Sequence, residues 1–194
     1  MIPCFSGTAI GLLAAALSLL TVSARADVSE AVQYRYYAVP IESGRTLKDS
    51  LIKASPIRQN GQILLGHTQW QVRWDLQWDR NTAGRCKLGR IQTHLKATVT
   101  LPQQSAKDPR KRPQFEALQQ ALREHQRAHL NLAREAAKRI DQRLWQLPAM
   151  STCSELNQAA NNLGQHLMTE ARQRSLAYDQ REGQGRRGAE ALVD

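Results

Sequence analysis

Apolar and polar residues alternate strictly along residues 68–79, "TQWQVRWDLQWD". One set of alternate positions holds only large apolar side chains: Trp70, Val72, Trp74, Leu76 and Trp78. The positions between them are polar: Gln71, Arg73, Asp75 and Gln77. A period of two matches the pleat of a β-strand and does not match a helix. The pattern therefore predicts a strand in a sheet that has one buried face.

A second alternating run follows the polar turn "RNTAGR". Its apolar set is Ile91, Leu95, Ala97, Val99 and Leu101, and its polar set is Arg90, Gln92, His94, Lys96 and Thr100. The two runs predict a long antiparallel hairpin. Upstream, "QYRYYAV" at 33–39 predicts another strand, because it is rich in aromatic and β-branched residues. Thr46, followed by Asp49 and bounded by Pro56, predicts a short helix over 47–54.

The second half of the chain has a helical pattern. Residues 102–113 are polar, proline-rich and basic, and predict a connector. From 114 to 146 one stripe recurs at three- and four-residue spacing: Phe115, Leu118, Leu122, His125, His129, Leu132, Ala136, Ile140 and Leu144. This spacing predicts a long helix that ends before Pro148. A second helix is expected at about 152–175, with Leu156, Leu163, Leu167 and Ala171 on its buried side, followed by an irregular tail over 176–194.

These elements predict an α+β fold: an N-terminal antiparallel sheet with one short helix over 27–101, then two long helices over 114–175. We interpret the four tryptophans as core residues, since core packing explains aromatic side chains on an inward face more simply than a stacking platform does. The whole of 27–194 is predicted to be one domain.

Residues 1–26 have the pattern of a secretory signal peptide. An apolar run from Ala9 to Val22 is followed by Ala24-Arg25-Ala26, a small-residue cleavage pattern, so we expect cleavage before Asp27. A retained N-terminal anchor is the alternative. No later apolar stretch is long enough to span a membrane. The mature chain is therefore expected to be exported to the periplasm or the medium.

Charge and cysteine content agree with export. The chain has 27 Lys and Arg against 17 Asp and Glu, and the signal peptide removes one arginine and no acid, which leaves a mature charge of +9. The mature chain keeps two cysteines, Cys86 and Cys153, and an even number in an oxidising compartment predicts a disulfide between them. Two separate buried thiols are the alternative. No nucleic-acid-binding motif is present.

The chemistry of the chain centres on "LREHQRAHLNLA" at 122–133. His125 and His129 are four residues apart in the apolar stripe, so on a helix both imidazoles face the same way and can reach one ion. Two core histidines hydrogen-bonded to buried partners would explain the same spacing. A second pair at this spacing, His166 and Glu170, lies off the apolar side of its helix and is interpreted as a surface pair.

The order of these features resembles a bacterial family of predicted secreted zinc-dependent proteases, described mainly as a domain of unknown function with a zincin-like helix. The resemblance runs from about Tyr36 to Ala189 and includes the strand "GHTQWQVRW", both cysteines, the two-histidine helix and a tail that begins "YD". In that family the helix reads H-E-x-x-H and the tail resembles Y-D-x-x-T-x-H-G. The resemblance implies zinc ligation by His125 and His129, and a role in binding for Tyr178 and Asp179 in a tail that also matches at Gly185.

Two departures from the family pattern bear on the chemistry. Gln126 stands where the family has the glutamate that serves as general base, and Gln184 stands where the tail has histidine. Glu182 stands where the family has threonine. An amide has no titratable proton near neutral pH, and loss of a general base typically costs about 10² to 10⁴ in rate. Glu182 or Gln184 is considered as the third metal ligand.

Three functions are consistent with the sequence. The first is an exported protein with the zinc-protease-like fold whose peptidase activity is impaired or lost, and which acts on or binds polypeptide. The second is an active zinc metallopeptidase that uses Glu182 or another acid. The third is a non-enzymatic binder of anionic cell-envelope components, which the basic residues at 107, 110–112, 172, 174, 186 and 187 would favour.

Overall fold

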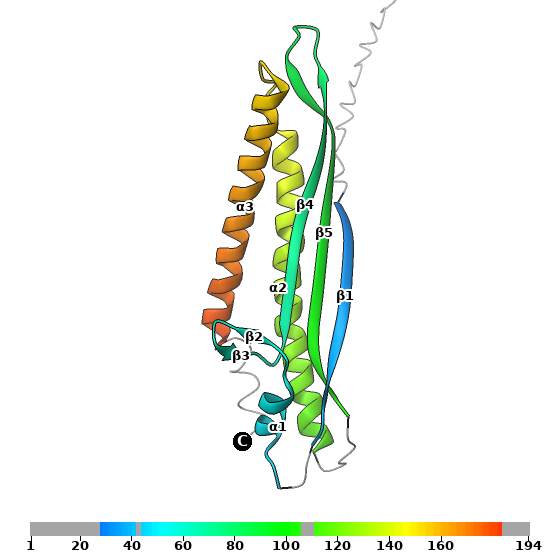
Figure 1. Ribbon diagram of the computed structural model, residues 1–194, viewed down its shortest axis with the longest axis vertical. Coiled ribbons are helices and arrows are strands. Elements are labelled where there is room, and N and C mark those ends of the chain that lie inside the picture. The colour runs from blue at the N-terminus through cyan, green and yellow to red at the C-terminus, as the bar shows by residue number, and fades with distance from the viewer. Residues whose placement is uncertain (1–27, 42–43, 106–110, 184–194) are drawn as a thin grey trace, which may run out of the picture.

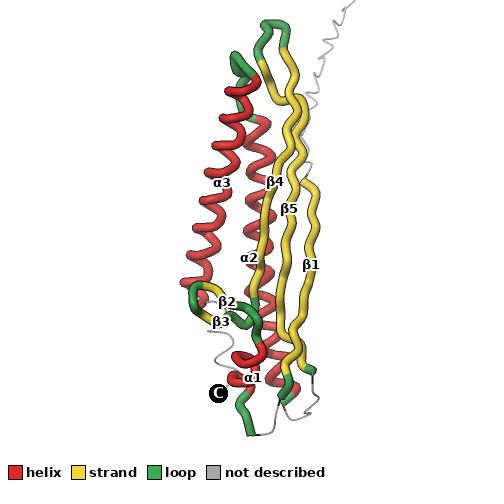
Figure 2. The backbone as a smooth tube through the Cα atoms, viewed as in Figure 1, coloured by secondary structure: helices red, strands yellow, loops and turns green. Residues whose placement is uncertain are grey.

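The computed structural model describes residues 28–41, 44–105 and 111–183. They form an elongated α+β fold in which a narrow sheet packs along two long helices (Figures 1 and 2). In chain order the elements are β1 (Val28–Val39), α1 (Leu47–Ala54), β2 (Arg58–Gln59), β3 (Gln62–Ile63), β4 (His67–Arg80), β5 (Cys86–Gln104), α2 (Arg112–Trp145) and α3 (Cys153–Glu182). The predicted fold class, a sheet followed by helices, is confirmed.

The main sheet has the strand order β1-β5-β4. β4 and β5 form the predicted antiparallel hairpin, whereas β1 pairs with β5 in parallel, from Val28 opposite Thr93 to Val39 opposite Gln104. The expectation of a purely antiparallel sheet is therefore wrong for β1. The reason is the position of β5: it returns in the direction of β1 and lies between β1 and β4, so it pairs with both.

The hairpin has the predicted two faces. Val72 is buried, and Trp70, Trp74 and Leu76 are partly buried against the same core, while the intervening polar residues are exposed. Trp78 departs from the prediction because a register shift between Gln77 and Trp78 ends the regular pairing, and its side chain is 43% exposed. Trp145, at the last position of α2, is 40% exposed. Only two of the four tryptophans therefore contribute to the core as expected.

α2 supplies most of the helical core. Its predicted stripe is buried throughout except at Leu132, which is partly buried. The stripe divides between two clusters: Phe115, Leu118 and Leu122 pack with β1 and α1, and Ile140 and Leu144 pack with the hairpin and α3. Burial of each such Leu or Ile side chain stabilises the folded state by about 1.5–3 kcal/mol. α2 therefore holds the sheet and α3 in one structure.

α3 is longer than the sequence pattern indicated. It begins with a capping box between Thr152 and Glu155 and continues to Glu182, where Gly183 ends it in a left-handed conformation (φ 61°). The predicted irregular tail is therefore helical over 176–182. No Gly or Pro interrupts this stretch, and only Gly183 adopts the left-handed geometry of a helix end without a steric penalty.

Two contacts fix α3 along β4. Near its start, Cys153 forms a disulfide with Cys86 at the beginning of β5, as predicted. Near the end of the first third of α3, Trp74 donates its indole N–H to Asn161 Oδ1 at 3.0 Å and packs over Gly164. A Cβ at Gly164 would lie 2.4 Å from the Trp74 ring, so glycine is needed for this approach.

Some predictions concern segments that the structure does not describe. The signal peptide at 1–26, part of the basic connector, and Gln184 with the rest of the C-terminal tail lie outside the described residues. Within the described residues, no helix is both long enough and apolar enough to cross a membrane.

Tyr37 provides a test of the core near α1. Its hydroxyl donates to the Leu65 carbonyl at 2.8 Å, and burial raises the pKa of Tyr37 to about 12 from the ordinary tyrosine value of 10.0. Because the folded pKa is the higher one, this stabilisation is present below pH 10 and is lost as the pH rises from 10 to 12. We expect Tyr37→Phe to lower the free energy of unfolding by about 1 kcal/mol at pH 8.

Between pH 10 and 12 the free energy of unfolding should fall less in Tyr37→Phe than in the wild type. The difference between the two losses should reach up to about 3 kcal/mol. Urea unfolding at pH 8 and pH 11 measures both effects. The control is Tyr36→Phe, which changes an adjacent exposed tyrosine. Equal pH dependence in the two variants would show that Tyr37 does not titrate as a buried group.

Candidate metal centre

Three side chains from two helices converge near the end of α3. α2 places His125 and His129 one turn apart, and α3 places Asp179 against both. The Asp179 Oδ1 atom lies 3.0 Å from His125 Nε2 and 2.9 Å from His129 Nε2, and the two Nε2 atoms are 3.1 Å apart. Both histidines are about 6% exposed. The predicted histidine pair is therefore joined by a carboxylate in a largely buried position.

This group fits a divalent metal ion in both chemistry and size. Two imidazole nitrogens and one carboxylate oxygen form a common zinc ligand set. Ligand atoms about 2.0–2.1 Å from a tetrahedral ion lie roughly 3.3 Å from one another, so the three atoms here would need to separate by only a few tenths of an ångström. Among the described residues, these three form the group of His, Cys, Asp and Glu side chains able to hold a metal.

Ser175 orients one of the two imidazoles. Its Oγ lies 2.8 Å from His129 Nδ1, on the opposite side of the ring from the Nε2 atom that faces Asp179. A hydroxyl can either donate to or accept from a ring nitrogen. It can therefore accept the Nδ1–H of a histidine whose Nε2 binds a metal, or donate to Nδ1 when the Nε2–H is bonded to Asp179. Metal-binding histidines usually have such a second partner.

Tyr178 covers the histidines from α3. Its ring stacks on His125, with centroids 4.9 Å apart and an interplanar angle of 26°, and meets His129 edge-on at 5.2 Å. Burial, together with the Glu182 carboxylate, raises the pKa of Tyr178, so its phenol is protonated at neutral pH. Tyr178 therefore holds the imidazoles in place, which gives a physical role to a residue predicted from the family resemblance.

Asp179 is ionised in this arrangement. Burial alone would raise the pKa of its carboxyl. The hydrogen bonds with His125 and His129 have a larger opposite effect, so the pKa of Asp179 lies well below its usual value of 3.8. A carboxylate that stays ionised down to acidic pH is suited to binding a cation. It also holds the two histidines together in the absence of one.

Gln126 makes a structural contact with β4. It is 3% exposed, and its Oε1 accepts a hydrogen bond from Thr68 Oγ1 at 2.9 Å. The same hydroxyl lies 3.2 Å from the Gln126 carbonyl oxygen. A Cβ at Gly66 would lie 3.2 Å from Gln126 Nε2, so the chain entering β4 approaches this amide closely. The residue at the general-base position is thus engaged in joining α2 to the sheet.

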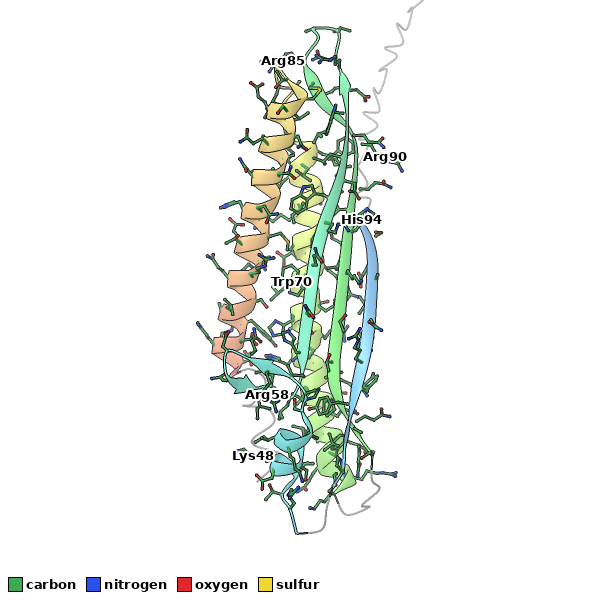
Figure 3. All side chains as sticks on the ribbon, in the orientation of Figure 1. Lys48, Arg58, Trp70, Arg85, Arg90 and His94 are labelled. Atoms are coloured by element: carbon green, nitrogen blue, oxygen red, sulfur yellow. A yellow bond between two sulfur atoms is a disulfide. The ribbon has the colours of Figure 1, made fainter. Side chains whose placement is uncertain are left out.

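A cleft of about 510 Å³ opens beside the histidines. One wall runs from Gln59, next to Arg58, to Trp70; Arg58 and Trp70 are labelled in Figure 3. The opposite wall comes from the last turns of α3. The lining residues are Gln59, Asn60, Gln62, Leu64, Gly66, His67, Thr68, Gln69, Trp70, His125, Gln126, His129, Arg172, Ser175, Leu176, Asp179 and Gln180. Asp179 is the sole carboxylate among these described lining residues.

His67 is a third histidine in this cleft. It comes from the first position of β4, and burial lowers its pKa, with a further lowering from nearby His129 and an opposing effect from Asp179. Its imidazole is therefore neutral at neutral pH. His67 is not part of the three-residue group, but it can present an uncharged nitrogen to a molecule in the cleft.

Glu182, considered as third ligand from the sequence, does not join the histidines. It is exposed at the end of α3, 3.8 Å from the Arg181 guanidinium, and does not line the cleft. Asp179 occupies the position considered for Glu182, which lies three residues further along α3, about 300° around the helix and about 4.5 Å along its axis. Gln184 and Gly185 lie outside the described residues. His166 and Glu170 form an exposed pair at 3.1 Å, as interpreted from the sequence.

Sequence analysis missed two parts of the site. Asp179 was assigned to binding in general, whereas the α3 stripe of Leu167 and Ala171 continues in helical phase to Ser175, Tyr178 and Asp179, so extending the helix to Gly183 would have identified all three. The β2–β3 hairpin, one wall of the cleft, also went unpredicted. The sequence feature that indicates this hairpin is the dipeptide Asn60-Gly61. Both residues have positive φ (49° and 76°), as a two-residue hairpin turn requires.

Comparison with known proteins identifies a bacterial family. A family model described as "Bacterial protein of unknown function (DUF922)" matches residues 34–185, a range that includes the cleft, the three-residue group and both cysteines of the disulfide. No curated protein and no solved structure matches the chain.

The Asp179 contacts can be tested against an exposed pair of the same kind. We expect Asp179→Asn, in metal-free protein, to lower the free energy of unfolding by about 1–3 kcal/mol at pH 7, because the charged acceptor of two buried hydrogen bonds is lost. The folded pKa of Asp179 is the lower one, so this stabilisation is present above pH 3.8 and declines as the pH falls below it.

Asp75→Asn is the matched control, since Asp75 Oδ2 lies 3.1 Å from His94 Nε2 on the exposed surface. This control should lose less than about 1 kcal/mol. Urea unfolding at pH 7 and pH 3 measures both variants. Equal losses at pH 7 would contradict a special role for the buried group.

Proposed function

The chain belongs to this family of bacterial proteins of unknown function, and from its buried metal centre we propose that it is an exported zinc-binding protein with impaired or lost peptidase activity. The observation that carries the proposal is the convergence of His125 Nε2, His129 Nε2 and Asp179 Oδ1 within 2.9–3.1 Å of one another. Three protein ligands leave a fourth position for water or a ligand. All three ligand residues line the cleft, which has room for such a ligand.

Zinc in such a site supplies a Lewis acid that polarises a bound oxygen. The chain's own residues would bind the ion, orient the imidazoles through Ser175 and Tyr178, and shield the group from bulk water. Peptide hydrolysis also needs a group that accepts a proton from the attacking water and passes it to the leaving amine. Gln126 stands at that position in the helix, and an amide cannot perform this step.

The composition of the cleft supports impaired hydrolysis. Among its described lining residues, the single carboxylate is Asp179, which is already bonded to both histidines. Glu182 is exposed outside the cleft. Most of the remaining polar lining consists of amides, which bind peptide groups by hydrogen bonds and transfer no protons. The site is thus better suited to retaining a polypeptide than to cleaving it.

Export is the part of the proposal that rests on the sequence pattern of residues 1–26. The Cys86–Cys153 disulfide supports it, because disulfides persist in oxidising compartments. The disulfide ties the start of α3 to the sheet, while the metal centre lies near the other end of the same helix. α3 is thereby held at both ends.

An active metallopeptidase is the second candidate, and His67 is the observation that favours it. His67 lines the cleft and burial keeps its imidazole neutral, so it has a nitrogen that can accept a proton. In this case peptide hydrolysis by the wild-type protein would be abolished by His67→Gln without loss of zinc. If the zinc-loaded wild-type protein hydrolyses no peptide, the second candidate is wrong and the binding function is retained.

Zinc binding is tested directly on the mature chain, residues 27–194. After removal of metals with a chelator, isothermal titration with zinc should show one ion per chain, because the cluster has ligands for one. His129→Ala should abolish this binding, while His94→Ala, at the exposed pair with Asp75, should leave it unchanged. Zinc binding that is equal in both variants, or absent from the wild type, would overturn the proposal.

A single substitution tests whether the missing base limits catalysis. Gln126→Glu restores a carboxylate at the general-base position, where Thr68 can still donate to it. We expect chelator-sensitive cleavage of an unfolded polypeptide such as casein to rise by about 10² to 10⁴ over the wild type. Gln180→Glu, which adds a carboxylate elsewhere in the cleft, is the control and should not increase cleavage. No gain in Gln126→Glu that binds zinc normally would show that the scaffold lacks more than a base.

A further inference from the structure

A second surface lies on the other side of α2 from the metal centre. Arg123 precedes His125 by two residues, which corresponds to about 200° around the helix, and Arg127 precedes His129 by two residues in the same way. Both arginines are exposed and face β1 across two adjoining hollows of about 340 and 310 Å³, which share Tyr36 and Arg123. We call this surface the β1–α2 groove and define it by Tyr34, Tyr36, Arg112, Arg123, Arg127 and Arg134.

Two aromatic rings form the sheet side of the groove. Tyr34 and Tyr36 pair in register with Val99 and Leu101 of β5, so they point to the face of the sheet that carries the core. Because β1 lies beyond the part of the sheet that α2 covers, their side chains are still 54% and 48% exposed. Exposed tyrosines beside arginines have the composition typical of protein-binding surfaces.

The arginines of the groove are only partly neutralised. Arg134 is paired with Glu30 through contacts of 2.6–3.1 Å, and Arg112 lies 3.9 Å from Glu116. Arg123 donates to the neutral amide of Gln119, and Arg127 forms no ion pair or side-chain hydrogen bond with any other described residue. Neither guanidinium is paired with a carboxylate of the described residues, so both can bind carboxylates of a partner, for which their planar geometry is well suited.

β1 also has an unused hydrogen-bonding edge. It pairs with β5 on one side, and no other strand among the described residues pairs with its opposite side. Residues 29–31, 33–36 and 38 are exposed, so eight of its twelve residues lie near solvent. A long open edge of this kind can accept another extended chain as an additional strand.

From these features we propose that the β1–α2 groove binds an acidic polypeptide segment, which adds to β1 as a fourth strand of the sheet. Alternate side chains of such a strand lie about 7 Å apart. Arg123 and Arg127 are four helical residues apart, or about 6 Å along α2. Carboxylates at alternate positions of the added strand therefore match Arg123 and Arg127, and they would project to the same face of the sheet as Tyr34 and Tyr36.

A second copy of this chain is a poorer occupant than an acidic partner. The chain carries a formal charge of +10, so self-association at an arginine-lined groove would bring like charges together. The metal centre faces the opposite side of α2, so occupancy of the groove leaves the cleft open. The proposal therefore does not depend on zinc binding.

The probe is a fluorescein-labelled eight-residue peptide in which glutamate alternates with valine. Its binding to the mature protein is followed by fluorescence anisotropy at 150 mM salt, with and without zinc. We expect Arg123→Gln combined with Arg127→Gln to weaken binding about tenfold, because two exposed ion pairs are lost. The matched control combines Arg73→Gln with Arg90→Gln, which removes the same charge from exposed positions on β4 and β5 and should leave binding unchanged. Arg90 is labelled in Figure 3.

Two further measurements separate strand addition from simple charge attraction. A peptide N-methylated at every second residue cannot pair along one edge, and it should bind at least tenfold more weakly. Hydrogen exchange should show new protection of the β1 amides when the unmodified peptide is bound. Equal binding of the methylated peptide, equal loss in both double variants, or no binding to the wild type would overturn the proposal. So would tighter binding of polygalacturonate through the same arginines, which would identify the occupant as an anionic glycan.

Discussion

Burial of α2 on two sides is the constraint on which the rest of the structure depends. Its first apolar residues pack with β1, β5 and α1, and its later ones pack between the β4–β5 hairpin and α3. A helix held in this way cannot rotate without exposing Leu122, Leu130 and Ile140, each of which is almost completely buried. The rotation of α2 is therefore fixed by packing, and that rotation directs His125 and His129 at α3 and Arg123 and Arg127 at β1.

The candidate metal centre follows from this geometry together with the length of α3. The disulfide and the packing of Trp74 over Gly164 align α3 with β4, and an uninterrupted helix then carries Ser175, Tyr178 and Asp179 to the level of the histidines. Each of the three contacts an imidazole in a different way: by a hydrogen bond, by ring stacking, and by a carboxylate contact. The histidines are consequently oriented before any ion binds, which lowers the cost of forming a metal site.

The residues around the candidate metal centre are suited to binding a metal but not to hydrolysing a peptide. Ligands and their supporting contacts are present, whereas Gln126 is bonded to Thr68 and the remaining polar lining is mainly amide. Such a site can hold an ion and a ligand without a proton acceptor matched to the attacking water. The basic, aromatic β1–α2 groove lies on the other side of α2, away from the cleft.

By itself the sequence determined the two faces of the hairpin and the buried stripe of α2 through periodicity, the helix over 47–54 through its capping residues, and the cysteine pair through an even cysteine count. These features depend on local patterns or on composition, so they can be predicted without knowledge of the fold. The parallel pairing of β1 and the contact of Asp179 with both histidines were decided only by the tertiary structure. Asp179 is separated from His129 by 50 residues, and no local pattern states which turn of α3 reaches which turn of α2. Their alignment follows from the packing of α3 along β4, where a disulfide and a tryptophan over a glycine set the register.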